Sequence, residues 1–118
     1  MESRLRKILA LTTLLLILVS FGAAQSAGET LFTQHCIGCH GGDLSGHTNF
    51  GKKANIPDLK TAIVQNRSDN DLFAAIGRGE GHKEYPHGFL SRGLTAVQIK
   101  NLITYIRSMS TVTASAKK

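Results

Sequence analysis

The sequence predicts an all-α fold of three to five short helices. Two segments carry apolar side chains at helical spacing behind a capping box, and no segment alternates polar and apolar residues for long enough to form a strand. The chain has 118 residues, of which 42% are apolar and 19% are charged. That length suits one small domain and excludes a multidomain enzyme.

The N-terminus has the three-part plan of a secretory signal peptide. Basic residues within 4–7 precede an apolar stretch at 8–19 and small residues at 22–24. We predict that residues 1–24 are a signal peptide cut after Ala24, with a cut after Ser26 nearly as favourable. An uncleaved membrane anchor is the alternative, because residues 8–24 together only just reach the length that crosses a bilayer. Either reading places the rest of the chain in the periplasm or otherwise outside the cytoplasm.

The domain itself is expected at residues 25–110, and its first helix at 28–36. That helix would place Leu31, Phe32 and Cys36 on neighbouring turns. Residues 38–57 are rich in glycine and polar side chains, which favours a loop. A long loop in so small a domain usually wraps a ligand or another part of the chain.

A second helix is predicted after Ser68, which forms a capping box with Asp71. Gly77 and Gly79 should end it. Its apolar face would be formed by Leu72, Phe73 and Ile76. Residues 79–93 contain further glycines without a clear period and are predicted to form another loop.

The last helix should begin after Thr95, which forms a capping box with Gln98. Its apolar stripe comprises Ile99, Leu102, Ile103, Ile106 and Met109. Residues 111–118 are predicted to be a flexible basic tail.

Residues 36–40, Cys-Ile-Gly-Cys-His, match the C-x-x-C-H pattern of covalent haem attachment. Two thiols at this spacing can each add to a vinyl group on one porphyrin edge, and His40 can then face the iron. A redox-active dithiol would need a strand and helix framework that the sequence lacks, and zinc would need two histidines at spacings unlike a common finger. We therefore predict one haem c per chain, held by Cys36 and Cys39 with His40 as proximal ligand.

Together with this motif, the sequence resembles the small single-haem class I c-type cytochromes over most of residues 27–109. The resemblance implies that Gly28 and Phe32 on the first helix pack against Tyr105 on the last. A glycine permits close helix approach and an aromatic pair can fill the crossing, so we expect position 28 to reject side chains larger than a methyl group. The resemblance also implies that the backbone carbonyl of Pro57 accepts the second N–H of His40.

The chain departs from this family at the second axial ligand. The family supplies a methionine before the last helix, whereas this chain has Tyr85-Pro86-His87 there, and Met109 continues an apolar stripe. Imidazole binds both iron states, so His87 is the preferred distal ligand. Tyr85 and His82 are alternatives, as is an open or water-filled site.

The resemblance implies an exported carrier of single electrons between redox proteins rather than an enzyme, although the chain could also be the electron-accepting subunit of a periplasmic oxidoreductase. The missing methionine motivates an alternative, a sensor or scavenger of nitric oxide, carbon monoxide or peroxide. A ring including Lys52, Lys53 and Lys83 could steer an acidic partner. Nucleic-acid binding is disfavoured, because the chain lacks a basic stripe with interleaved aromatic residues.

Overall fold

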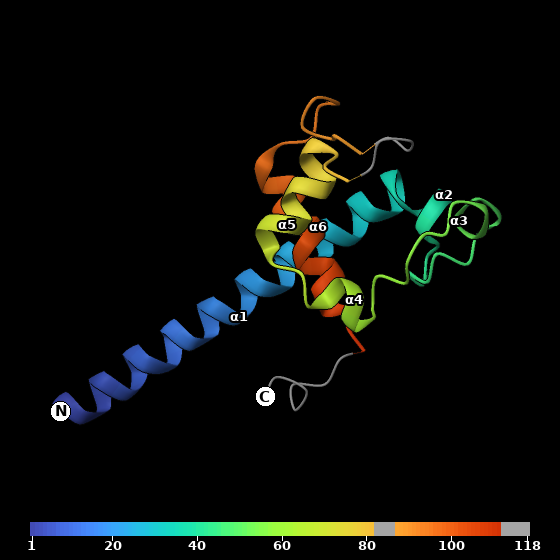
Figure 1. The fold of residues 1–118 in the computed structure, drawn as a ribbon. Helices are drawn as coiled ribbons and strands as arrows, with labels where there is room; N and C mark the ends of the chain where they lie inside the picture. Colours follow the sequence, from blue (N-terminus) through green and yellow to red (C-terminus); the bar gives the residue numbers. More distant parts are fainter. Residues whose placement is uncertain (82–86, 112–118) are drawn as a thin grey trace.

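A computed structural model describes residues 1–81 and 87–111 of the chain. Those residues form helices and loops without a strand, which confirms the all-α prediction (Figure 1). In chain order the elements are α1 (Glu2–His35), α2 (Ile37–His40), α3 (Asn49–Lys53), α4 (Ala62–Gln65), α5 (Asp69–Phe73), the π-helix η1 (Ala74–Arg78) and α6 (Ala96–Ser108). The single-turn helices α2, α3 and α4 lie in or just after the glycine-rich segment, where the sequence showed no helical period.

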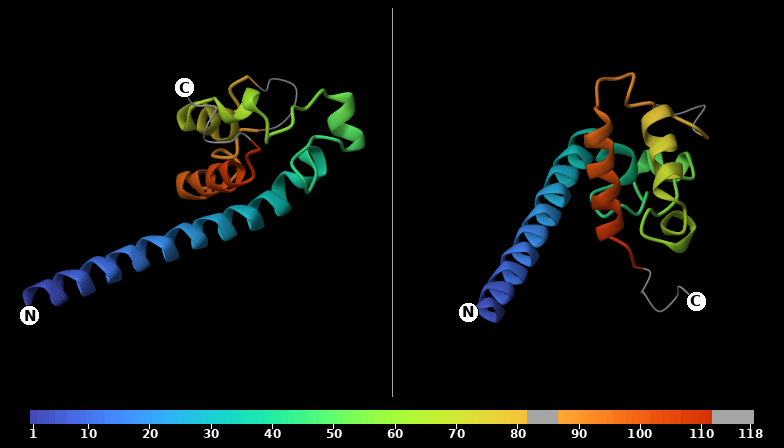
Figure 2. Two further views of the ribbon diagram at one scale, coloured as in Figure 1. Left: turned by 90° about the horizontal axis from the view of Figure 1, so that it is seen from below. Right: turned by 90° about the vertical axis from the view of Figure 1, so that its left-hand side faces the viewer.

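Helix α1 is longer than expected. The sequence predicted a separate helix from Gly28, but one continuous helix runs from Glu2 to His35. Residues 23–27 connect the two parts, and their composition, with three alanines and no proline, suits a helix. The N-terminal part projects away from the other elements (Figure 2). It is long and apolar enough to cross a membrane, a property that signal sequences share, so cleavage after Ala24 stays a prediction.

Helices α1 and α6 cross at Gly28, as expected. A Cβ atom built on Gly28 would lie 2.7 Å from Cβ of Tyr105 and 2.8 Å from the carbonyl carbon of Asn101. The rings of Phe32 and Tyr105 pack beside this contact with their centroids 5.5 Å apart. The crossing therefore excludes even a methyl group, which is a stricter limit than the sequence suggested.

The core consists of two apolar clusters that share α6. The first joins the end of α1 to α6 and contains Leu31, Phe32, Leu44, Leu102, Tyr105 and Ile106. The second joins α4, α5 and the segment after η1 to α6, and contains Val64, Leu72, Phe89, Ile99 and Ile103. Met109 packs against the first cluster, in agreement with a structural role.

Both predicted capping boxes are present, at Ser68 and Asp71 before α5 and at Thr95 and Gln98 before α6. The end of the second predicted helix differs, because Gly77 lies inside η1 and does not end it. Gly79 does end it, in a left-handed conformation with φ of 75°. The turn of this π-helix is wider than an α-helical turn, and it lies beside the candidate site.

Candidate functional site

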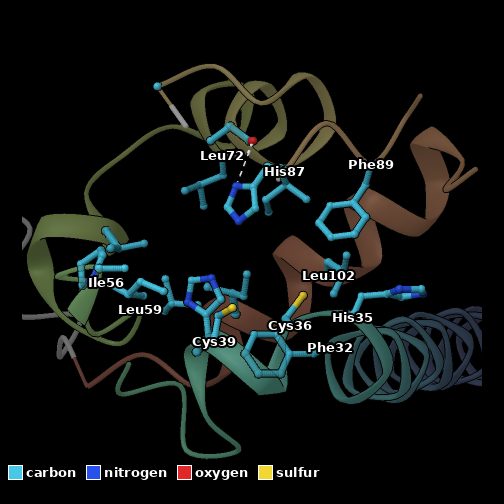
Figure 3. A pocket seen from close by; sticks show the side chains of 18 of the residues that line it. Phe32, His35, Cys36, Cys39, Ile56, Leu59, Leu72, His87, Phe89 and Leu102 are labelled. Atoms are coloured by element: carbon cyan, nitrogen blue, oxygen red, sulfur yellow. Dashed lines mark hydrogen bonds between the residues drawn. The ribbon is translucent and has the colours of Figure 1, made fainter. Parts of the chain in front are cut away.

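A pocket of about 640 Å³ opens between the two clusters and collects the predicted site residues. Cys36, Cys39 and His40 line it together with His87 (Figure 3). His87 enters from the side opposite the cysteines. Apolar side chains from both clusters make up much of the wall, among them Phe32, Val64, Leu72, Phe89, Leu102 and Ile106. A group bound here would complete the core that these helices leave open.

Local hydrogen bonds fold the 36–40 motif into one turn. The backbone N–H groups of Cys39 and His40 both donate to the carbonyl oxygen of Cys36, at 3.2 and 2.9 Å. The hydroxyl of Thr48 donates to the carbonyl oxygen of Cys39 at 2.7 Å. A Cβ atom at Gly51 would lie 2.7 Å from that same oxygen. The loop after the motif is therefore packed directly against it, which fixes the turn that carries both thiols.

The thiol of Cys36 is held in its neutral form. Burial, with a smaller contribution from the neighbouring Cys39, raises the pKa of this thiol to about 12. Thiol–disulfide exchange requires a thiolate. The protonated thiol therefore weighs against the redox-dithiol alternative.

The two histidines that line the pocket have a spacing that fits a shared iron. Their ring centroids are 6.1 Å apart and their planes differ by 23°. An imidazole nitrogen binds a transition metal at about 2 Å, and each ring centre lies about 1.1 Å behind that nitrogen, so two rings on one metal have centroids roughly 6 Å apart. The distance between the rings of His40 and His87 therefore matches the separation expected for two imidazole ligands of one iron atom.

His87 is oriented by a backbone contact. Its Nδ1 atom lies 3.2 Å from the carbonyl oxygen of Ala75. A carbonyl oxygen can only accept a hydrogen bond, so Nδ1 carries the proton and donates it. In this tautomer the other ring nitrogen, Nε2, carries no proton, which is the form that binds a metal.

Three pocket-lining residues were not predicted from the sequence. Arg67 and Arg92 line the pocket, and no carboxylate is among its described lining residues, so their charge suits the carboxylate groups that haem carries. His35 is exposed, but its ring lies edge-on to that of Phe89, with the centroids 5.8 Å apart, and it also lines the pocket. No spacing rule marks these side chains, because the fold brings them together from separate loops and helix ends.

The remaining predicted residues fall into two groups. Pro57 lines the same pocket as His40, but among the described residues no hydrogen bond runs from the buried Nδ1 of His40 to the carbonyl oxygen of Pro57, so the predicted bond is not found. Lys52 and Lys53 are exposed in the last turn of α3. His82, Lys83 and Tyr85 lie outside the described residues.

Among known protein families, the chain matches Cytochrome c over residues 25–110. Comparison with curated proteins gave no match, and neither did comparison with solved structures. The matched range begins just after the predicted signal peptide and ends just after α6. It includes all the described residues that line the pocket.

Proposed function

The chain belongs to the cytochrome c family and carries covalently bound haem c, and on that premise we propose an exported single-haem electron carrier with two histidine ligands. Cys36 and Cys39 hold the haem, His40 is the proximal ligand and His87 the distal one. The observation that carries this proposal is the 6.1 Å separation of the two imidazole rings across the pocket. When bound, the haem iron takes up and releases one electron.

The protein residues around the haem would set its reduction potential. An imidazole donates more strongly to ferric iron than a thioether does, so two histidine ligands favour a lower reduction potential than one histidine and one methionine. The apolar wall of the pocket excludes water from the iron, which keeps the site dedicated to electron exchange. Arg67 and Arg92 would neutralise the carboxylate groups at the edge of the macrocycle.

An acidic redox protein is the proposed partner. Phe50 on α3 lines the pocket, and Lys52 and Lys53 follow it on the same short helix. The two exposed ammonium groups therefore lie close to the place where the haem would be bound. Charges at that position speed the encounter with an acidic surface at low ionic strength.

We also propose export, with removal of residues 1–24. The basic start, the apolar stretch and the small residues near Ala24 support it. The mass of the mature protein tests this proposal, since cleavage after Ala24 leaves Gln25 as the first residue. Recovery of the full-length chain in the membrane fraction would instead establish a retained anchor.

The main test uses the purified holoprotein. Extraction with acid acetone should leave the colour with the polypeptide, and loss of the haem into acetone would contradict covalent attachment. The ferrous protein should be six-coordinate, low-spin and slow to bind carbon monoxide. His87→Ala should make it high-spin and reactive toward carbon monoxide.

His47→Ala is the matched control, because His47 is exposed and is not among the described residues of the pocket wall. It should leave both the spectrum and the carbon monoxide reaction unchanged. Rapid binding of carbon monoxide by the wild type, or an unchanged spectrum in His87→Ala, would show that His87 is not the distal ligand.

A further inference from the structure

The π-helix η1 ends with backbone carbonyl groups that face the distal side of the pocket. In an α-helix the N–H of Gly79 would donate to Ala75, four residues earlier. Here the N–H of Gly79 donates to the carbonyl oxygen of Ala74, five residues earlier, and the N–H of Glu80 donates to that same oxygen at 3.2 Å. The wider register therefore releases the Ala75 carbonyl for a different donor.

Residues 87–90 supply the donors for the end of this helix. His87 donates through Nδ1 to Ala75 at 3.2 Å. The next three backbone N–H groups continue the pattern: Gly88 and Phe89 both donate to Ile76 at 3.1 Å, and Leu90 donates to Gly77 at 3.0 Å. Three consecutive carbonyl groups thus hold one four-residue segment, and the distal histidine is the first residue of that segment.

We propose that the carbonyl oxygen of Ala75, released by the π register of η1, positions His87 as an iron ligand. This inference rests on the proposed function, in which His87 is the distal ligand. The hydrogen bond fixes the ring in the tautomer with hydrogen on Nδ1 and directs Nε2 into the pocket (Figure 3). A metal-binding histidine that donates its other N–H in this way is both better oriented and more basic.

The geometry of Gly88 provides a way to disturb this arrangement without touching His87. Gly88 has φ of 77°, a conformation that side chains with a Cβ atom rarely adopt, and its N–H is one of the four donors. A Cβ atom there would meet no atom closer than 3.7 Å. Gly88→Ala therefore strains the backbone of the 87–90 segment and does not fill the pocket.

Gly93 offers a matched control. Its φ of 102° also lies in the region that side chains with a Cβ atom rarely adopt, and a Cβ atom there would have no neighbour within 4 Å. It lies outside the 87–90 segment and is not among the described residues of the pocket wall. Gly93→Ala should therefore lose a similar amount of stability and leave the orientation of His87 unchanged.

The experiment compares these holoproteins by competition with imidazole and by potentiometric titration. Loss of a supporting hydrogen bond to a histidine ligand typically weakens metal binding 10- to 100-fold. Gly88→Ala should therefore bind added imidazole at least about tenfold more tightly than the wild type, and its reduction potential should rise, because a less basic imidazole stabilises ferric iron less. Gly93→Ala should match the wild type in both measurements.

A second measurement needs no variant. In ferrous protein labelled with ¹⁵N-histidine, the Nδ1 proton of His87 should be observable and should exchange slowly with solvent. Rapid exchange in the wild type, or equal imidazole affinities in Gly88→Ala and Gly93→Ala, would overturn the positioning role of Ala75. An unchanged spectrum in His87→Ala would overturn the distal-ligand assignment itself, so the two failures are distinguishable.

Discussion

The carbonyl group of Asn101 on α6 occupies the space where a side chain at Gly28 on α1 would begin. The two helix backbones thus meet directly, and the aromatic pair of Phe32 and Tyr105 packs beside them. This contact joins the two ends of the domain. The first two predictions concern it.

Gly28→Ala should lower the stability of the holoprotein by about 1–3 kcal/mol, because the added methyl group must push two backbones apart. Chemical denaturation followed by circular dichroism measures the change. Gly42→Ala is the control, since a Cβ atom there meets only the Ile37 side chain at 3.5 Å. Equal midpoints for the two variants would show that the crossing adapts to a side chain.

Phe32→Ala should cost about 3–5 kcal/mol, because the ring is only 2% exposed and lies at the centre of the first cluster. A double-mutant cycle with Tyr105→Ala isolates the contact between the two rings. We expect a coupling free energy of about 0.5–1.5 kcal/mol. Strict additivity would mean that the rings stabilise the domain independently.

The capping box of α5 should make stability depend on acid. Hydrogen bonds from the hydroxyl and N–H of Ser68 lower the pKa of Asp71. The pKa of Asp71 is therefore lower in the folded state than in the unfolded state, where it is about 3.9. The hydrogen bonds of its carboxylate contribute fully to folding stability above that pH, and their contribution is lost as the pH falls through the folded-state pKa. Ser68→Ala should therefore flatten the acid side of a plot of denaturation midpoint against pH.

Thr95→Ala is the matched control for this pH effect. It removes the equivalent hydroxyl from the α6 capping box, in which the reciprocal partner is the uncharged Gln98. It should cost about 1 kcal/mol at every pH. An identical pH profile in both variants would show that Asp71 does not carry the acid dependence.

Arg107 should be sensitive to replacement by lysine. Its guanidinium donates to the carbonyl oxygens of Gln65 and Arg67 at 2.7 and 2.6 Å and to the carboxylate of Asp69 at 2.8 Å. A single ammonium group cannot make the same forked set of bonds, so Arg107→Lys should destabilise the protein by about 1–2 kcal/mol. Arg78→Lys, which alters an exposed ion pair with Glu80, should stay within about 0.5 kcal/mol in the same denaturation assay.

Charge reversal on α3 should slow electron transfer to an acidic partner. Lys52→Glu with Lys53→Glu should reduce the second-order rate at low ionic strength, and added salt should reduce the difference from the wild type. Lys100→Glu is the control, because Lys100 on α6 is exposed and is not among the described residues of the pocket wall. Stopped-flow kinetics with a flavodoxin-like acidic donor distinguishes steering from a change in the haem site, because only steering depends on salt.

The sequence was most informative where a local rule applied. The capping boxes at Ser68 and Thr95 and the apolar stripe of α6 were predicted because they depend on residues three or four positions apart. The C-x-x-C-H spacing likewise predicted which side chains would gather at one edge of the pocket. Gly28, Phe32 and Tyr105 required the family resemblance, since nothing in their local spacing connects the two ends of the chain.

The π register of η1 was not predictable from the same rules. Glycine ordinarily disfavours a helix, yet Gly77 lies inside η1. Leu90 and Ile99 pack against it, and the 87–90 segment donates a hydrogen bond to its carbonyl group. Arg67 and Arg92 were missed for a related reason. Their places at the pocket depend on how loops are held by distant residues, which periodicity does not report.

The crossing of α1 and α6 also has a consequence for biosynthesis. A ribosome completes the segment with Cys36 and Cys39 well before it makes the partner helix that carries Tyr105. The segment that carries both thiols therefore exists before the domain can close, because the crossing needs residues that are made later. A stop codon before Thr95 should consequently give a chain that still offers both thiols for attachment but is degraded rapidly, because three of the six residues of the first cluster and two of the five residues of the second are missing.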